Sequence, residues 1–480
     1  MNSKIVLKNF MWRFFERFGA KMVSMVVTII LARLLMPADY GTVALMNVFI
    51  NILAVFVDCG FTSALIQKKD ADDTDFSTVF YTQMLICLII YGGLFFCAPA
   101  IAKFYENPDV TAMTRVLSLT LIISGVKSVQ SAYISRNMMF KKFFFATLSG
   151  TIGAAALGII LAFAGFGTWA LIAQSLFNNL VDTVILWYSV EWRPRKLYSF
   201  ERLKGLFSYS SKLLVSALLN TGYNNLRSLI IGKVYTSEDL AFYERGKAYP
   251  NLLFSNIDAS INSVLLPAMS SEQENKSRVK AMTRRAIKTS TYITAPLLMG
   301  FAFCGTPLIR LLLTDNWLPA VPFQMIFCFI YLFGSIDTAN LNAIKALGRS
   351  DLFLKMEIIK KTIGILLVVI SAQISVMAIA YSMILFEIIT MLVNSRPNKK
   401  LLDYKYSEQL KDILPGILLA VFMGICVYWF KYLPIHDLLI LIIQFFTGAG
   451  IYIGGSALFK MESFVYMTSL LKGMLRDRKH

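Results

Sequence analysis

Long apolar stretches recur along the whole chain, and they constrain its fold more than any other feature of the sequence. Examples are Ile29–Leu35, Ile86–Ala98 and Ile363–Val369. Of the 480 residues, 56% are hydrophobic and 16% are charged, whereas a soluble domain carries roughly 25% charged residues. A bilayer core requires roughly 20 apolar residues per helix, and its backbone groups must be satisfied within the segment. The sequence therefore predicts an all-α, polytopic membrane protein.

We predict about fourteen membrane-spanning helices. Their approximate ranges are 10–32, 41–66, 77–102, 110–135, 143–165, 167–190, 205–232, 239–267, 282–305, 320–344, 352–373, 376–395, 412–430 and 437–458. We assign the first range to a helix and not to a cleavable signal, because Arg13, Arg17 and Lys21 interrupt its apolar run.

The number of lysine and arginine residues differs sharply between one connection and the next. One set of connections and the two termini hold 31 of these residues, and the alternate set holds five, which are Arg33, Lys103, Lys233, Arg310 and Lys431. Basic loops stay in the cytoplasm, so both termini are predicted to be cytoplasmic. The net charge of +18 is therefore mostly a signal of topology, and no soluble domain is present to form a nucleic-acid surface.

Cysteine and histidine give little support to enzymatic or metal chemistry. The six cysteines lie in apolar segments without the spacing of a zinc or redox motif; they are Cys59, Cys87, Cys97, Cys304, Cys328 and Cys426. The only histidines are His436 and His480. We expect no catalytic residue, no metal site and no cofactor.

An internal repeat appears when the sequence is shifted by 200 residues. Asp39, Asn51, Leu53, Asp58, Ser63 and Leu65 then match Asp239, Asn251, Leu253, Asp258, Ser263 and Leu265. A second similarity pairs the loop beginning at Arg136 with the loop beginning at Arg349. Both matches relate helices six apart, which predicts two six-helix lobes of one orientation with substrate at their interface. The predicted divisions are 1–195, 196–405 and a C-terminal segment of two helices and a tail, 406–480.

Polar residues form stripes on four of the predicted helices, which are the corresponding pairs of the two lobes. Residues spaced by three and four share one helix face, and polar residues within a membrane usually face a cavity or a partner. The stripes comprise Arg13, Arg17 and Lys21; Asn47, Asn51, Asp58 and Thr62; Asn220, Asn224 and Arg227, with Lys212 nearer the cytoplasm; and Glu244, Lys247, Asn251, Ser255, Asp258 and Asn262. For any single asparagine, hydrogen bonding between packed helices is the commoner role.

Depth in the membrane suggests ion pairs among the striped residues. We expect Arg17 or Lys21 to pair with Asp58, Lys212 with Asp258, and Arg227 with Glu244. The two aspartates and Arg227 and Glu244 are candidates for gating or ion coupling. Further intramembrane charges without an evident partner face rank lower; they are Lys127, Asp182, Asp337, Lys360, Lys361 and Glu387.

Four segments resemble motifs of the bacterial polysaccharide flippases of the Wzx type, which belong to the multidrug/oligosaccharidyl-lipid/polysaccharide exporter superfamily. The segments are 58–69 (DCGFTSALIQKK), 264–270 (VLLPAMS), 315–322 (DNWLPAVP) and 343–349 (AIKALGR). Each motif is loose by itself, but their order and spacing together are fairly specific.

The resemblance implies a flippase that moves undecaprenyl-pyrophosphate-linked oligosaccharide across the bacterial inner membrane by alternating access. Cations at the cytoplasmic mouth of a cleft attract an anionic substrate, so Arg13, Arg17, Lys21 and Lys212 are candidates for binding the pyrophosphate. Asn47, Asn51, Asn220, Asn224, Lys247, Asn251 and Ser255 are candidates for lining the glycan path. Coupling to a proton or sodium gradient, and assembly with a polymerase and other polysaccharide-assembly proteins, are further expectations.

Three alternatives stay open. An ion-coupled multidrug exporter of the same superfamily requires carboxylates free in its cavity, whereas the cations here outnumber the acids. A membrane polysaccharide polymerase or ligase generally has a large outer loop, and the longest outer connection here, about 306–319, is short and lacks histidine. A lipid II flippase shares the fold and logic, and the sequence separates it poorly.

Overall fold

The computed structural model describes residues 3–58 and 60–477, without the side chains of residues 3–11, 13–18, 58, 208, 209, 212, 350 and 470–477. Within these ranges the chain is helical and contains no strand, which confirms the predicted all-α class. The described chain divides into two compact units, Met1–Ala241 and Phe242–His480. The predicted lobes, 1–195 and 196–405, are a topological division that stays a prediction.

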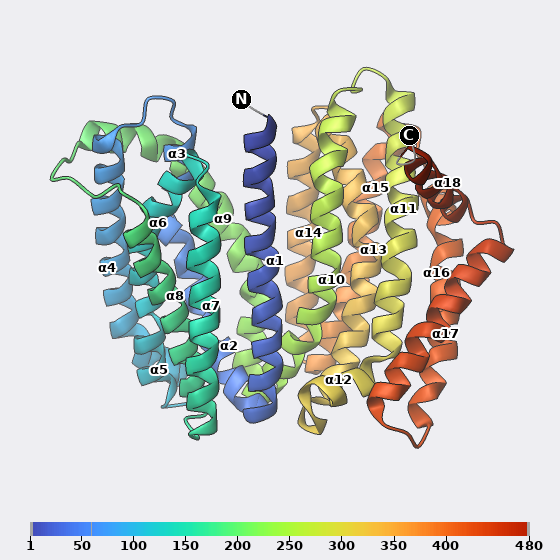
Figure 1. The fold of residues 1–480 in the computed structure, drawn as a ribbon, viewed down its shortest axis with the longest axis horizontal. Helices are drawn as coiled ribbons and strands as arrows, with labels where there is room; N and C mark the ends of the chain where they lie inside the picture. Colours follow the sequence, from blue (N-terminus) through green and yellow to red (C-terminus); the bar gives the residue numbers. More distant parts are fainter. Residues whose placement is uncertain (1–2, 59, 478–480) are drawn as a thin grey trace. The chain divides into compact units, whose positions relative to one another are not determined.

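In the part of the chain that the structure describes, the first unit contains nine helices and the start of a tenth; their labels are shown in Figure 1. They are α1 (Ser3–Leu34), α2 (Pro37–Asp58), α3 (Phe61–Gln67), α4 (Asp73–Phe104), α5 (Val110–Leu117), α6 (Leu119–Arg136), α7 (Phe140–Phe163), α8 (Thr168–Ser189), α9 (Phe200–Val234) and α10 (Ser237–Ser270). Helix α6 packs against α2, α3, α4 and α8, while α9 packs against α2, α3 and α4.

The second unit contains the rest of α10 and the remaining helices. They are α11 (Lys276–Phe303), α12 (Gly305–Leu313), the 3₁₀ turn η1 (Asp315–Trp317), α13 (Ala320–Ala346), α14 (Ser350–Ser371), α15 (Val376–Leu401), α16 (Tyr406–Tyr428), η2 (Trp429–Tyr432), α17 (Asp437–Leu458) and α18 (Glu462–Asp477). Helix α13 is the most buried long helix and packs against α11, α14 and α15.

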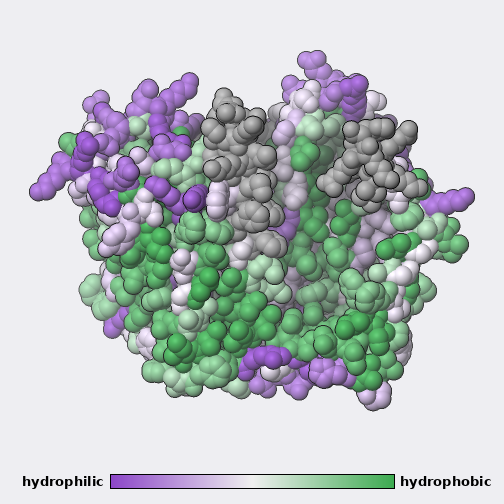
Figure 2. Space-filling view, viewed as in Figure 1, coloured by the Kyte–Doolittle hydropathy of each residue, from purple (hydrophilic) through white to green (hydrophobic). Residues whose placement is uncertain are grey.

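Every predicted range overlaps one helix or two consecutive helices. The ranges 41–66 and 110–135 are each divided, into α2 and α3 and into α5 and α6, and α12 and α18 were not predicted. Among the described residues, ten helices are long and apolar enough to span a membrane, or eleven if the bent pair α11 and α12 is one span. Apolar side chains cover the middle of the helices in each unit (Figure 2). The chain is thus a multi-pass membrane protein, and the count of fourteen spans stays a prediction.

The repeat at an offset of 200 has a clear structural basis at the start of α2 and α10. The Asp39 carboxylate accepts a hydrogen bond from the backbone N–H of Met36 at 3.0 Å, and Asp239 accepts one from Thr236 at 3.2 Å. These bonds satisfy N–H groups that a helix start leaves unpaired. The identity of the two aspartates therefore reflects how the two helices begin.

The same register fails to continue at the ends of these helices. Gly60, with φ of 70°, separates α2 from α3, whereas Ser260 lies inside the uninterrupted α10. A Cβ atom on Gly60 would lie 3.2 Å from the backbone oxygen of Ser210 in α9. Glycine is required here both for the left-handed backbone and for this close approach.

The second sequence similarity has a different register in the structure. Helix α6 ends at Arg136 and α13 at Ala346, and each is followed two residues later by a left-handed residue, Met138 or Gly348. The structural offset is therefore 210, so Arg136 corresponds to Ala346 and its predicted match with Arg349 is wrong. Basic composition of both loops produced the apparent match.

Basic residues that indicated the topology also form hydrogen bonds and ion pairs at the turn between α3 and α4. Arg136 donates hydrogen bonds to the backbone oxygens of Leu65, Lys68 and Lys69, which caps the end of α3. Lys68 lies 2.7 Å from the buried Asp75 carboxylate. Arg202 of α9 hydrogen-bonds Asp72, which lowers the pKa of that carboxyl, and lies 3.4 Å from Asp75.

We expect Arg136→Ala to lower the free energy of unfolding by about 2 kcal/mol, because hydrogen bonds from a charged donor contribute roughly 1.5–3 kcal/mol. Arg136→Lys should recover less than half, since an ammonium cannot span three carbonyls. Chemical denaturation of the purified protein in detergent measures both. Lys69→Ala is the control, because that side chain is exposed. Equal loss in the alanine variants would contradict the cap.

Candidate functional site

Several side chains of the predicted polar stripes are exposed in each unit. Asn51 of α2 and Asn220 and Asn224 of α9 are exposed in the first unit, and Asn251 of α10 is exposed in the second. Lys21 of α1 is also exposed, while Asn47, Lys247 and Ser255 are half-buried. Helix α10 thus contributes an open polar face to its unit, as do α2 and α9 to theirs. Their roles in lining a transport path stay predictions.

Several predicted contacts lie outside the described part of the structure. The side chains of Arg13, Arg17, Asp58 and Lys212 are not described, so the pairs of Asp58 with Arg17 or Lys21, and of Lys212 with Asp258, stay predictions. The pair of Arg227 with Glu244 joins residues of different units and also stays a prediction.

Arg227 is held within the first unit by an aromatic neighbour. Its side chain is 8% exposed, and its guanidinium carbon lies 5.3 Å from the centroid of the Tyr223 ring. Its Nη2 atom donates a hydrogen bond of 3.4 Å to the Tyr223 hydroxyl. Stacking on a tyrosine favours a buried guanidinium and fixes its direction along α9.

Asp258 belongs to a polar ladder between α10 and α13. Its carboxylate accepts hydrogen bonds from the hydroxyl of Thr338 and from the Asn262 side chain, the latter at 3.0 Å. Asn342 in turn donates to Asn262 at 2.6 Å. Carboxylates in an apolar medium require such partners, and the sequence did not indicate Thr338 or Asn342 because neither lies on a predicted stripe.

A second charged cluster lies on another face of α13. Asp337 has Glu387 and Asn394 of α15 as polar neighbours and lies within electrostatic range of Lys360 of α14. Lys360 is 7% exposed and pairs with Glu357 at 2.5 Å. One Asp337 oxygen is buried without a hydrogen bond.

The first unit has a simpler pair between α6 and α8. The Lys127 ammonium lies 2.7 Å from the Asp182 carboxylate, and both side chains are largely buried. The sequence analysis ranked six intramembrane charges below the stripes because they lacked a partner face; Lys127, Asp182, Asp337, Lys360 and Glu387 do have charged partners, and the ranking of all six, with Lys361, stays a prediction. The partners of Lys127, Asp182, Asp337 and Glu387 lie on other helices, which helix periodicity alone cannot reveal, whereas Lys360 pairs with Glu357 on its own helix.

The two charge sites occupy corresponding positions in their units. Lys127 precedes the end of α6 by nine residues, and Asp337 precedes the end of α13 by nine. The first site balances one cation with one carboxylate, whereas the second gathers three carboxylates, Asp337, Glu357 and Glu387, around Lys360. The second site therefore has an excess of negative charge that a proton or cation would relieve. Among the described residues, no cluster of three or more His, Cys, Asp or Glu side chains has the geometry to hold a metal ion.

We expect Lys127→Met to lower the free energy of unfolding by about 3–5 kcal/mol, because removing one partner leaves a carboxylate uncompensated. Lys127→Met combined with Asp182→Asn should recover most of this loss. Thermal unfolding in detergent compares the single and double variants. A double variant less stable than Lys127→Met would show that the pair does not form.

A family model described as "Polysaccharide biosynthesis protein" matches residues 30–322. The succinoglycan biosynthesis transport protein ExoT of Rhizobium meliloti (strain 1021) is 25% identical over 323 residues, covering 67% of this chain and 65% of the relative. The teichuronic acid biosynthesis protein TuaB of Bacillus subtilis (strain 168) is 25% identical over 305 residues, 62% of each chain. The lipopolysaccharide biosynthesis protein WzxC of Escherichia coli (strain K12) is 19% identical over 357 residues, covering 74% of this chain and 72% of the relative. The chain thus spans about two thirds of the length of the first two relatives.

Solved transporter structures share the fold. The lipid II flippase MurJ in an inward closed conformation matches with a TM-score of 0.74 at 17% identity, covering 93% of this chain and 98% of its own. An inward-facing multidrug resistance MATE transporter of the MOP superfamily matches with a TM-score of 0.63 at 14% identity, covering 80% and 94%. These matches confirm the predicted two-lobe transporter fold. With the family model matching more than half of its residues, the chain belongs to this family of polysaccharide biosynthesis proteins.

Proposed function

We propose that the protein is a flippase that moves a lipid-linked oligosaccharide across a membrane during polysaccharide biosynthesis. The observation that carries this proposal is that residues 30–322 match a polysaccharide biosynthesis family within a chain that has the fold of a lipid flippase. Relatives that share its sequence include a succinoglycan biosynthesis transport protein. Transport of a lipid-linked precursor is the step of polysaccharide biosynthesis that a protein with the fold of a lipid flippase would carry out.

The substrate would present three chemical parts, and the chain offers a surface for each. The pyrophosphate would bind cations of α1 and α9, for which Lys21 and Lys212 are candidates with Arg13 and Arg17. The glycan would hydrogen-bond the open asparagines Asn51, Asn220, Asn224 and Asn251. The lipid would lie in an apolar groove of about 740 Å³ between α10, α11, α16 and α17.

That groove is the feature that favours a lipid-linked substrate over a small drug as the transported molecule. It is lined by aliphatic and aromatic side chains that include Leu297, Leu308, Phe445, Phe446 and Ile453. An isoprenoid chain in such a groove would remain in an apolar medium while the polar head crosses the membrane. Substrate transport of this kind requires no covalent chemistry, so we propose that the protein is not an enzyme.

The membrane would be the bacterial inner membrane, with both termini in the cytoplasm. The support for this orientation is the asymmetry of Lys and Arg between alternate connections. Undecaprenyl-pyrophosphate-linked repeat units are made on the cytoplasmic leaflet and extended outside, which makes a polymerase of the outer leaflet a natural partner.

An ion gradient that drives transport would act on the second charge site, which contains Asp337, Glu387 and Lys360. Asp337 and Glu387, close together beside Lys360, cannot both ionise without strong mutual repulsion. Uptake of a proton or sodium ion would change the charge at α13 and α15, and therefore the packing of unit 2. The Lys127–Asp182 site differs in having one cation for one carboxylate.

Deletion of the gene followed by analysis of lipid-linked oligosaccharides tests the flippase. We expect complete repeat units to accumulate on the cytoplasmic leaflet. Unpolymerised units on the outer leaflet would instead identify a polymerase, and altered drug sensitivity with normal polysaccharide would identify a drug exporter.

Complementation of the deletion by two neighbouring variants tests the polar face. Asn224 is exposed, whereas the Asn225 side chain bonds the backbone oxygen of Thr221 at 2.8 Å. Asn224→Ala should lower the transport rate about threefold to tenfold, the effect of one lost hydrogen bond. Asn225→Ala should transport at the wild-type rate, and the reverse pattern would contradict the assignment of this face.

Reconstitution in vesicles tests the coupling site. We expect Glu387→Gln to retain flipping down a substrate gradient but to lose its acceleration by a proton or sodium gradient, because the amide cannot titrate. Asp351→Asn is the control, since Asp351 is an exposed surface residue paired with Arg349. If neither gradient accelerates the wild-type protein, or if Glu387→Gln still responds, then the coupling role is wrong.

A further inference from the structure

The second unit contains a basic cavity that the proposed transport path does not use. This cavity of about 880 Å³ lies between the first turns of α11 and of α18. Its cationic lining consists of Lys280, Arg284, Arg285, Lys288 and Lys460. Basic cavities at the ends of membrane helices are typical binding places for anionic lipid headgroups.

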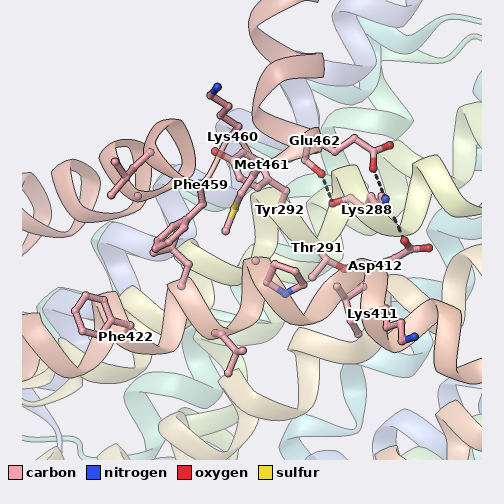
Figure 3. A pocket seen from close by; sticks show the side chains of 18 of the residues that line it. Lys288, Thr291, Tyr292, Lys411, Asp412, Phe422, Phe459, Lys460, Met461 and Glu462 are labelled. Atoms are coloured by element: carbon pink, nitrogen blue, oxygen red, sulfur yellow. Dashed lines mark hydrogen bonds and ion pairs between the residues drawn. The ribbon is translucent and has the colours of Figure 1, made fainter.

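Three carboxylates neutralise part of this charge. Asp412 of α16 lies 2.8 Å from Arg284 and 3.0 Å from Lys288. Lys288 also pairs with Glu462, and it lies between the two carboxylates (Figure 3). Glu408 lies 3.4 Å from Lys280. Five cations therefore meet three acids, and the cavity has a surplus of two positive charges.

The surplus resides on Arg285 and Lys460. Both side chains are exposed, and neither has a carboxylate partner among the described residues. The guanidinium of Arg285 lies over the Tyr466 ring at 4.1 Å, which orients it along α18. Lys460 has a left-handed backbone, with φ of 46°, in the turn that leads from α17 into α18.

An amphipathic cavity continues from the basic one. It has a volume of about 860 Å³ and shares Lys288, Lys460, Glu462 and Ser463 with the basic cavity. Leu458 and Phe459 line it beside Lys460, and its apolar part continues along α16 and α17, lined by Leu418, Leu419, Phe422 and Ile451. Charge at one end and an apolar channel at the other match the two parts of a phospholipid.

Helix α18 provides the third observation. It is a helix of 16 residues, and its described side chains, 462–469, include the run Phe464, Val465, Tyr466 and Met467. Its first turn is attached to α11 through Glu462 and Ser463, and Tyr466 follows one turn later. Val465 of the same turn lines the basic cavity and is about half exposed.

We propose that the cavity between α11 and α18 binds the phosphate of an anionic membrane phospholipid through Arg285 and Lys460, with one acyl chain along α16 and α17. The bound lipid completes the charge balance of the cavity and holds α18 against α11. The ligand chemistry is a lipid phosphate. A free or substrate-borne pyrophosphate shares the anionic chemistry but does not fill the apolar channel in the same way.

Lipid binding to the purified full-length protein tests the proposal. Native mass spectrometry would compare phosphatidylglycerol with phosphatidylcholine for the wild type and for Arg285→Gln combined with Lys460→Gln. We expect the wild type to prefer phosphatidylglycerol, and the double variant to bind it about thirtyfold more weakly, the effect of removing two cations from an anionic lipid. Lys399→Gln combined with Lys400→Gln is the matched control, because both lysines are exposed and carry the same charge.

Hydrogen exchange provides a second readout that does not depend on transport. Phosphatidylglycerol should slow amide exchange in α18 of the wild type and of the control, but not of the Arg285/Lys460 variant. Equal binding of both lipids, or equal loss in the control variant, would overturn the proposal. Displacement of phosphatidylglycerol by inorganic pyrophosphate at similar concentration would also overturn it, because the site would then recognise phosphate without the lipid.

Discussion

The structure depends on one constraint, which is that a polar group in hydrocarbon must find its partner within the protein. Helices satisfy the backbone, so the remaining problem is the side chains. The chain solves it in discrete places: Lys127 with Asp182 across α6 and α8, Asp258 with Thr338 across α10 and α13, and Asp337 beside Glu387 and Lys360. These contacts join helices far apart in sequence, so they determine which helices become neighbours within each unit.

Corresponding helices of the repeat begin or end in the same way, but they carry different charged residues. Helices α2 and α10 begin with the same aspartate cap, and α6 and α13 end with the same left-handed turn. On that shared frame, α6 carries a balanced ion pair and α13 carries an excess of carboxylates.

The two C-terminal spanning helices have acquired a separate role in this scheme. Their intramembrane sequence is nearly free of charge, and α16 and α17 instead build apolar cavities with α11. Asp412, near the start of α16, forms the centre of the ionic cluster that attaches α16 to α11 and, through Lys288, to α18. The pair therefore contributes apolar lining to both cavities, and this ionic cluster attaches it to α11.

The sequence by itself determined the all-α membrane class, the approximate helix ranges, the family resemblance and the offset of 200 between α2 and α10, because apolar length, charge asymmetry and helix caps are local properties. It also indicated which faces of α2, α9 and α10 stay polar. Tertiary structure decided the break at Gly60, the offset of 210 between α6 and α13, and the partners of Lys127, Asp258 and Asp337. Those features depend on which helix lies opposite another, and periodicity along one helix carries no information about the helix across from it.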